Sequence, residues 1–337
     1  MDLLNSLTES LLSPMVLAFG LGIIATLVRS DLKIPEPLYA AMTIYLLFAI
    51  GLKGGAKLDG VSPAAFTQPA LAALLLCLAI PVWSFALLHR WGHLNRTDAA
   101  AIAAHYGSVS VVTFGASVAY LETQGVTHEG FLPALLALME VPGILVALLL
   151  ARMAMAPARP ARALGFVSAA PSDAAGMIRE LLASKGILLL LGGMVIGLVS
   201  GPTGYAQVGA LFDAPFRGVL TLFLLELGLV AGRRLADAKS AGAFLVIFAL
   251  VMPVLHGLLG VWLGREVGLS VGGAMIFGTL AASASYIAAP AAVRMALPEA
   301  NPALYLTSAL ALTFPFNLVI GIPLYFSFAR WLFGLPA

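Results

Sequence analysis

Two short serine motifs are candidates for binding a small ion. Ser108–Ser110 and Ser283–Ser285 both have the pattern Ser-x-Ser, and each lies inside a long apolar stretch. Polar side chains are costly in such stretches and usually serve a function. Gly107 precedes the first motif and Pro290 follows the second, and both residue types weaken a helix. We therefore expect two broken helices, whose free amides suit an anion and whose freed carbonyls suit Na⁺.

The candidate substrate-binding residues surround these two breaks. They are Gly107, Ser108, Ser110, Thr113, Ser283 and Ser285. The alternative is packing, because small residues and serines bonded to helix carbonyls are common where membrane helices touch. Since the motif occurs twice in corresponding places, a binding site is the favoured interpretation.

Glu140 is a carboxylate in the middle of another apolar stretch, just before Pro142. A carboxylate there is a candidate cation ligand or proton carrier; the alternative is a structural carboxyl group. Thr313 and Asn317 occupy corresponding places later in the chain and could add neutral oxygens. We therefore predict a cation-binding group of Glu140, Thr313 and Asn317, with Na⁺ favoured over a proton.

Lys53 and Glu226 are charged residues on two further apolar segments. Their places along these segments put both on one face of what we interpret below as the same repeated element. We predict a structural ion pair between them, which would lower the cost of burying either charge. The alternative is that Lys53 extends to the membrane surface.

The composition indicates an all-α integral membrane protein. Of the 337 residues, 61% are hydrophobic and 10% are charged, whereas soluble domains are about 25% charged. This excludes a cytosolic enzyme or a nucleic-acid-binding protein, and a single cysteine, Cys77, excludes an intrachain disulfide. The sequence offers no catalytic constellation and no nucleotide-binding glycine motif, so we expect neither an enzyme nor a cofactor.

The apolar segments predict ten transmembrane helices, with the fourth and ninth discontinuous. Their ranges are Leu11–Val28, Pro37–Leu52, Pro69–Leu88, Asp98–Glu122, Phe131–Ala151, Gly186–Val199, Phe216–Gly232, Ala243–Leu263, Val271–Met295 and Leu304–Leu324. The first residues lack a basic segment and a cleavage site, so no signal peptide is expected. Most of the 18 lysines and arginines fall on one side of this arrangement. The positive-inside rule then places both termini outside a plasma (inner) membrane.

The two halves of the chain carry matching residues in the same order. Gly51-Leu52 matches Gly228-Leu229, and Pro142 matches Pro315, at nearly constant offsets. Because five spans are an odd number, the second half must be inverted relative to the first. We therefore predict a 5+5 inverted repeat. Its parts are a first repeat at 1–153, a cytoplasmic linker at 154–185 with an amphipathic helix at Ser172–Ser184, and a second repeat at 186–337.

Several collinear motifs resemble the sodium-dependent bicarbonate transporter family, the SbtA-like permeases of cyanobacteria. They include Ile34-Pro35-Glu36, Leu121-Glu122, Pro215-Phe216-Arg217-Gly218, Ala281-Ala282-Ser283 and Asn301-Pro302. The resemblance implies bicarbonate uptake driven by Na⁺, a mobile core, a trimer and a PII-like cytoplasmic regulator. The sequence departs from the family pattern at Tyr286, where the family has an aspartate, and at Glu140, where the family also has aspartate.

The resulting hypothesis is a secondary transporter that imports a small anion, most simply bicarbonate with Na⁺, by an elevator-like or rocking alternating-access mechanism. The ten-span layout also resembles bile-acid/sodium symporters and auxin-type carriers, so an organic anion, possibly coupled to protons, is the second hypothesis. A membrane sensor that transports nothing is the alternative of another class.

Overall fold

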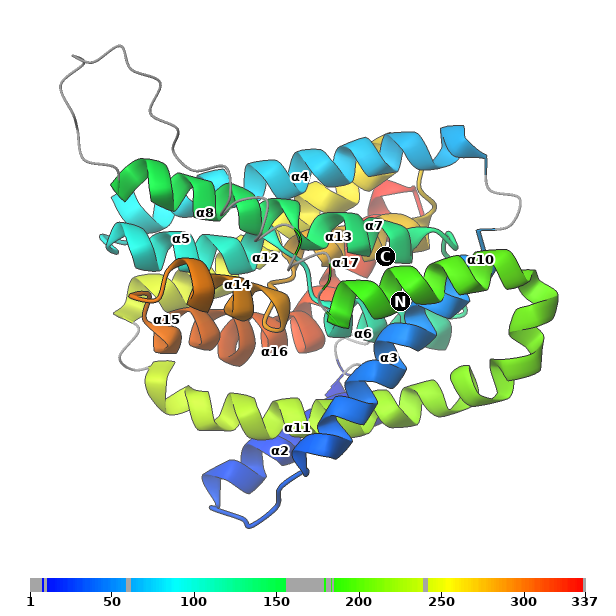
Figure 1. Ribbon diagram of the computed structural model, residues 1–337, viewed down its shortest axis with the longest axis horizontal. Helices are drawn as coiled ribbons and strands as arrows, with labels where there is room; N and C mark the ends of the chain where they lie inside the picture. Colours follow the sequence, from blue (N-terminus) through cyan, green and yellow to red (C-terminus); the bar gives the residue numbers. More distant parts are fainter. Residues whose placement is uncertain are drawn as a thin grey trace.

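The computed structural model describes residues 8, 11–58, 62–155, 179, 183, 185–238 and 242–335. Every regular element in this described part is a helix (Figure 1). The first half contains α2 (Pro14–Leu27), α3 (Glu36–Ala56), α4 (Pro63–Arg90), α5 (Arg96–Gly107), α6 (Val111–Thr123), α7 (Leu132–Glu140) and α8 (Pro142–Met155). The second half contains α10 (Lys185–Phe212), α11 (Ala214–Ala238), α12 (Gly242–Glu266), α13 (Val271–Ala282), α14 (Ala288–Ala296), α15 (Pro302–Leu306), α16 (Phe314–Phe316) and α17 (Ile322–Leu332). Two π-helical segments, η1 (Thr307–Thr313) and η2 (Asn317–Gly321), flank α16.

The helices form two packed groups. The most extensive contacts join α3 with α10 and α2 with α11, and we call these four helices the panel. The other helices form the core, in which α4, α5 and α8 pack together and α12 packs on α13. Figure 1 shows α2 and α11 along the bottom and α3 and α10 toward the right, so the panel lies below and to the right of the core. The two groups meet mainly where α11 contacts η1 and where α3 and α10 contact α7.

Side-chain caps fix where several helices begin. The capping residues, each accepting a hydrogen bond from an amide of the first turn, are Ser13, Ser62, Asn95, Ser110, Ser270 and Asn301. A proline follows the cap at the start of α2, α4 and α15. Proline suits this position because the amide it lacks would have no partner in the helix.

Eight of the described helical segments are long and apolar enough to cross a membrane. They are Glu36–Ala56, Ala64–Arg90, Arg96–Thr123, Leu132–Ala151, Lys185–Phe212, Ala214–Leu235, Gly242–Glu266 and Pro302–Leu332. The prediction of ten spans is therefore only partly matched. The first predicted span contains a helix of 14 residues, about 21 Å long, and the ninth is interrupted after Ala282.

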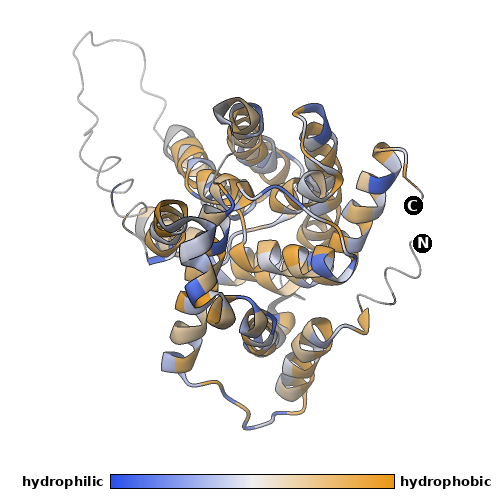
Figure 2. Ribbon diagram, turned by 90° about the vertical axis from the view of Figure 1, so that its right-hand side faces the viewer, coloured by the Kyte–Doolittle hydropathy of each residue, from blue (hydrophilic) through white to orange (hydrophobic). Residues whose placement is uncertain are grey.

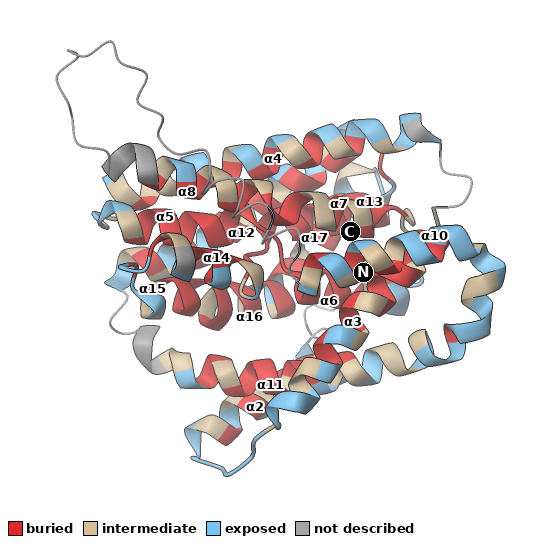
Figure 3. Ribbon diagram, viewed as in Figure 1, coloured by how far each residue is buried: buried red, intermediate tan, exposed pale blue. Residues whose placement is uncertain are grey.

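The burial pattern separates lipid-facing helices from central ones. In Figure 3, exposed positions line the outer sides of α4 and α10, while α5 is almost entirely buried. The exposed positions on α4 and α10 include Leu71 and Leu188, which are 61% and 65% exposed. Figure 2 shows that most residues of the helices are hydrophobic. An apolar exterior around buried polar helices is the arrangement expected in a bilayer.

Some element boundaries differ from the sequence prediction. The predicted sixth span ends at Val199, but α10 continues to Phe212 through a kink at Gly201, where φ is +63°. A left-handed backbone at this point suits glycine, which has no Cβ. Apart from Arg179 and Ala183, the predicted amphipathic helix at Ser172–Ser184 lies outside the described residues, as does most of the predicted linker.

Candidate functional site

Both serine motifs interrupt their helices, as the sequence predicts. The chain leaves helical geometry at Ser108 and Ser110 in the first motif and at Ser283 in the second. All three residues have extended backbone conformations. The two interruptions contact each other directly. The Ser110 amide donates to Ser283 Oγ at 3.0 Å, and the Ser285 amide donates to the carbonyl of His105 at 2.8 Å. The breaks are therefore one joint structure that links the two halves of the chain.

Two half-helices begin at this crossing. Ser110 Oγ caps α6 by accepting from the Thr113 amide at 3.1 Å, and Ser285 Oγ accepts from the Ala289 amide of α14 at 3.2 Å. The first amides of any helix have no carbonyl of that helix to bond, and they form its positive end. Two positive helix ends thus face one place, which suits an anion. Pro290 lies in the first turn of α14, where a proline is tolerated, rather than at the break itself.

A small cavity lies at the crossing, between core and panel. Its volume is about 20 Å³, which is room for about one water molecule. Its lining consists of Leu47, Val109, Ser110, Val111, Glu140, Gly186, Ser285, Tyr286 and Ile287. Leu47 belongs to α3 and Gly186 to α10, so the panel closes one side of the cavity. The hydroxyl, carboxyl and phenol groups all come from the core.

Glu140 is the carboxylate of this cavity. It is 4% exposed, and its Oε2 atom has no hydrogen-bond partner among the described residues. Its backbone carbonyl accepts a hydrogen bond from Ser108 Oγ at 2.7 Å, which ties the end of α7 to the break after α5. Its side chain lies against Gly186 of α10. A buried carboxylate oxygen without a partner is costly, and a cation or a proton would offset that cost.

Thr313 and Asn317 do not line this cavity, so the predicted grouping with Glu140 is not formed there. Thr313 Oγ1 donates to the carbonyl of Ala249 at 2.7 Å and lies 2.6 Å from the Tyr106 hydroxyl. Asn317 Nδ2 donates to the carbonyl of Ala282 at 2.8 Å. Both side chains therefore satisfy backbone carbonyls of α12 and α13.

Of the six predicted substrate-binding residues, two line the cavity and four do not; one of these four is Ser108, which bonds to the backbone carbonyl of Glu140. Ser110 and Ser285 line the cavity. Ser283 bonds to the Leu280 carbonyl and holds the crossing together, and Thr113 is buried in the first turn of α6. Gly107 is a close-packing position, because a Cβ atom there would lie 2.9 Å from the ring of Pro81.

The predicted ion pair between Lys53 and Glu226 is wrong. Lys53 Nζ lies 3.0 Å from Asp213 and 3.3 Å from Glu122. Glu226 is buried further along α11 and accepts a hydrogen bond from the Ile34 amide. From Asp213 to Glu226 the helix rises by about 20 Å. In the predicted repeat the two residues share one face of the same repeated element, but sharing a face in this sense does not bring two side chains close in space.

The sequence reasoning missed the ionic contacts around Lys53. Glu122 and Arg217 lie in motifs that carried the family resemblance, and they pair across helices at 3.0 Å. Tyr286 departs from the family pattern, and residue spacing does not predict its position in the cavity lining. Opposite charges at the ends of separate apolar segments were the available signal.

The histidines form no metal site. Within the part of the chain that the structure describes, no three His, Cys, Asp or Glu side chains gather as metal ligands. His105 Nδ1 lies 2.6 Å from the Ala101 carbonyl, and its ring stacks on Tyr305. His256 accepts a hydrogen bond from the indole of Trp83 at 2.7 Å. These contacts indicate packing roles.

The apolar helices and the buried polar crossing define an integral membrane protein of the transporter class. The family model of the Na⁺-dependent bicarbonate transporter superfamily matches residues 14–330, and the chain belongs to this superfamily. The resemblance seen in its motifs is thereby confirmed. No curated protein matches the sequence. Membership implies a transport function for bicarbonate and sodium rather than catalysis.

Proposed function

We propose that this chain imports bicarbonate together with Na⁺ and binds the anion where α6 and α14 begin. One observation carries the proposal: Ser110 and Ser285 meet beside Glu140 in a single cavity. The anion would accept hydrogen bonds from the serine hydroxyls and from the first amides of both half-helices. Several donors aimed at one point, with two positive helix ends, suit a small oxyanion.

Charge balance explains why a cation would accompany the anion. Moving one negative charge into a cell with an inside-negative potential costs about 2.3 kcal/mol per 100 mV. A Na⁺ carried in the same cycle cancels that electrical cost. Glu140 is the candidate Na⁺ ligand because it is the acidic residue in the cavity lining, and hard cations prefer carboxylate oxygen. Tyr286, at the aspartate position of the family, offers at most a neutral oxygen at neutral pH.

The packing of the helices supports the 5+5 inverted repeat. Under the predicted repeat, α2 corresponds to α10 and α3 to α11, so the pair α2–α11 corresponds to the pair α10–α3. These are the two pairs that build the panel. In the core, the pair α4–α5 corresponds in the same way to α12–α13. Reciprocal pairing of this kind is expected from two inverted halves.

Alternating access would then be a movement of the core against the panel, elevator-like or rocking. The cavity of about 20 Å³ holds about one water molecule and is too small for the four heavy atoms of bicarbonate. Loading therefore requires Leu47 and Gly186 of the panel to separate from the core. The proposal also includes an inner-membrane location with both termini outside, which is based on the distribution of lysine and arginine. It further includes a homotrimer and a PII-like regulator, which are based on the family resemblance.

Uptake of labelled bicarbonate into proteoliposomes, with and without an inward Na⁺ gradient, tests this function. We expect accumulation only with the gradient, and no competition from excess bile acid or auxin. Uptake that is independent of the Na⁺ gradient and depends on a proton gradient would contradict sodium coupling. Competition by organic anions would instead support the second hypothesis from the sequence.

Substitution of the two serines tests the binding position. Ser110→Ala and Ser285→Ala should each weaken bicarbonate binding about tenfold to a hundredfold, since a hydrogen bond to a charged group contributes about 1.5–3 kcal/mol. Ser117→Ala is the matched control, because Ser117 is a buried serine of α6 that bonds to the Phe114 carbonyl and lies outside the cavity lining. Equal effects of all three substitutions would remove the assignment of the site.

A further inference from the structure

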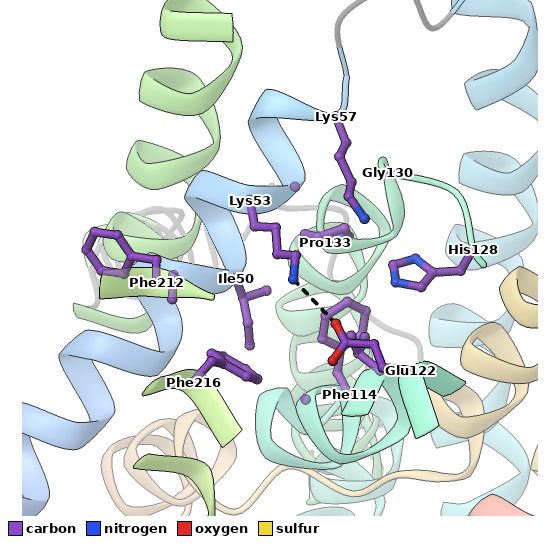
Figure 4. A pocket seen from close by; sticks show the side chains of 14 residues that line it. Ile50, Lys53, Lys57, Phe114, Glu122, His128, Gly130, Pro133, Phe212 and Phe216 are labelled. Atoms are coloured by element: carbon purple, nitrogen blue, oxygen red, sulfur yellow. Dashed lines mark hydrogen bonds and ion pairs between the residues drawn. The ribbon is translucent and has the colours of Figure 1, made fainter. Parts of the chain in front are cut away.

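Glu122 has both carboxylate oxygens held by cations of the panel. It lies at the end of the core helix α6, whereas Lys53 and Arg217 lie on the panel helices α3 and α11. Lys53 Nζ is 3.3 Å from Oε1, and Arg217 donates to Oε2 from Nε at 3.2 Å and Nη2 at 3.0 Å. Figure 4 shows Lys53 and Glu122 facing each other across a cavity that Lys57 and His128 also line.

The panel positions Lys53 without help from Glu122. Asp213 lies at the start of α11 and contacts Lys53 Nζ at 3.0 Å. The hydroxyl of Tyr205 donates to the same carboxylate at 2.8 Å. Burial raises the pKa of Asp213, but the hydrogen bonds from Lys53 and Tyr205 outweigh it and hold this pKa below its usual range. Asp213 is therefore ionised at neutral pH and keeps Lys53 in place.

Charge and exposure make this position suitable for an anion. Without Glu122, two cations and the Asp213 carboxylate leave one net positive charge, to which Lys57 adds another nearby. The side chains of Lys53, Arg217 and Glu122 are 34%, 45% and 37% exposed and all lie at helix ends, where a spanning helix reaches the membrane surface and small ions in water would meet them. Ion pairs that are this exposed contribute little net stability. A dissolved anion can therefore replace the Glu122 carboxylate at small cost.

We infer that Lys53 and Arg217 form a second anion site, a receptor for a planar carboxylate-like anion, which Glu122 fills in this conformation. Bicarbonate has the same O–C–O arrangement as the Glu122 carboxylate and would make the same contacts. Because the receptor belongs to the panel and Glu122 to the core, movement of the core withdraws Glu122 and frees the receptor. The site would then gather anions next to the boundary along which the central cavity opens.

Calorimetric titration of the purified full-length protein with sodium formate tests the receptor. Formate is a planar carboxylate, and sodium chloride at equal ionic strength is the reference. Glu122→Gln should bind formate about fivefold more tightly than the wild type, because the weak internal competitor is removed. Adding Lys53→Gln or Arg217→Gln to Glu122→Gln should abolish that gain. Glu266→Gln is the matched control, since Glu266 forms an exposed pair with Arg265 elsewhere.

Two results would overturn the inference. One is formate binding by Glu122→Gln that is no tighter than that of the wild type. The other is a gain that persists after both cations are replaced. All variants are first checked for a single peak in size exclusion, and Arg217→Gln serves if Lys53→Gln does not fold. The inference rests on the proposed function only in naming bicarbonate. If the wild type showed no Na⁺-driven bicarbonate uptake, the proposed function would be refuted, but the formate result would still decide whether the second anion site exists.

Discussion

Gly143 is the position at which the structure makes its sharpest prediction. It is the second residue of α8 and lies against the last residue of α5, Gly107. A Cβ atom on Gly143 would lie 1.8 Å from the carbonyl oxygen of Gly107 and 2.3 Å from its carbonyl carbon. Such contacts require a separation of more than 3 Å, so Gly143→Ala must push the two helices apart by more than 1 Å.

The expected cost of Gly143→Ala has two parts. Overpacking of this kind destabilises a protein by about 1–3 kcal/mol. The displaced carbonyl directly precedes Ser108, which bonds to the backbone of Glu140 across the same contact. The cavity should therefore lose its geometry as well, and a misplacement of about 1 Å can reduce activity by about a hundredfold. Bicarbonate uptake should fall at least tenfold.

The assay compares melting in detergent and bicarbonate uptake for Gly143→Ala and Gly192→Ala. Gly192 is a helical glycine of α10, and a Cβ there would meet nothing within 4 Å. Gly192→Ala should leave melting unchanged or raise it, because alanine favours a helix by about 0.5–1 kcal/mol. If Gly143→Ala melts and transports like the wild type, the close approach of α5 and α8 is refuted.

Two further predictions concern the carboxylate and its predicted neighbours. Glu140→Gln should raise the Na⁺ concentration for half-maximal uptake at least tenfold at fixed pH, because the cavity loses its carboxylate. Sodium dependence that survives unchanged would exclude Glu140 as the cation ligand, and uptake that follows pH alone in the wild type would make it a proton carrier. Thr313→Val should lower the melting temperature, because the hydrogen bond to Ala249 is lost and the Tyr106 hydroxyl loses a partner, at a cost of about 1–3 kcal/mol. The sodium concentration for half-maximal uptake should not change, and a change would restore Thr313 to the cation site.

The sequence predicts the broken helices well because their cause is local. A Ser-x-Ser motif in an apolar stretch signals a break wherever it occurs, and Ser110 and Ser285 cap the helices that restart, although Pro290 lies in the first turn of α14 and not at the break. The prediction that both motifs meet followed from the repeat, and the bond between Ser110 and Ser283 agrees with it. Glu140 was likewise identified because a carboxylate in an apolar stretch is conspicuous by itself.

The predictions that failed were about which side chains touch. The predicted repeat places Lys53 and Glu226 on one face of the same repeated element, and it places Thr313 at the position that corresponds to Glu140. In an inverted repeat, a twofold axis determines which residues of the two halves correspond. Whether two corresponding residues touch depends on how far each of them lies from that axis. Thr313 ends up against α12, and Lys53 meets Asp213, because α3 crosses the panel next to the start of α11. Side-chain contacts of this kind need coordinates.

The division of the cavity lining bears on how the transporter would move. Ser110, Ser285, Glu140 and Tyr286 all belong to the core, and the panel contributes Leu47 and Gly186, which carry no polar side-chain atom. If the two bodies rocked about a fixed ligand, the polar contacts would be shared across the moving boundary. In the proposed function, the core would carry its ions past an apolar surface without breaking any side-chain contact to them. An ionic contact between the bodies that such a movement would break is the exposed one at Glu122. Since exposed pairs contribute about 0–1 kcal/mol each, this contact would add little to the barrier, and within the proposed function we therefore propose elevator-like movement, with rocking as the alternative to test against it.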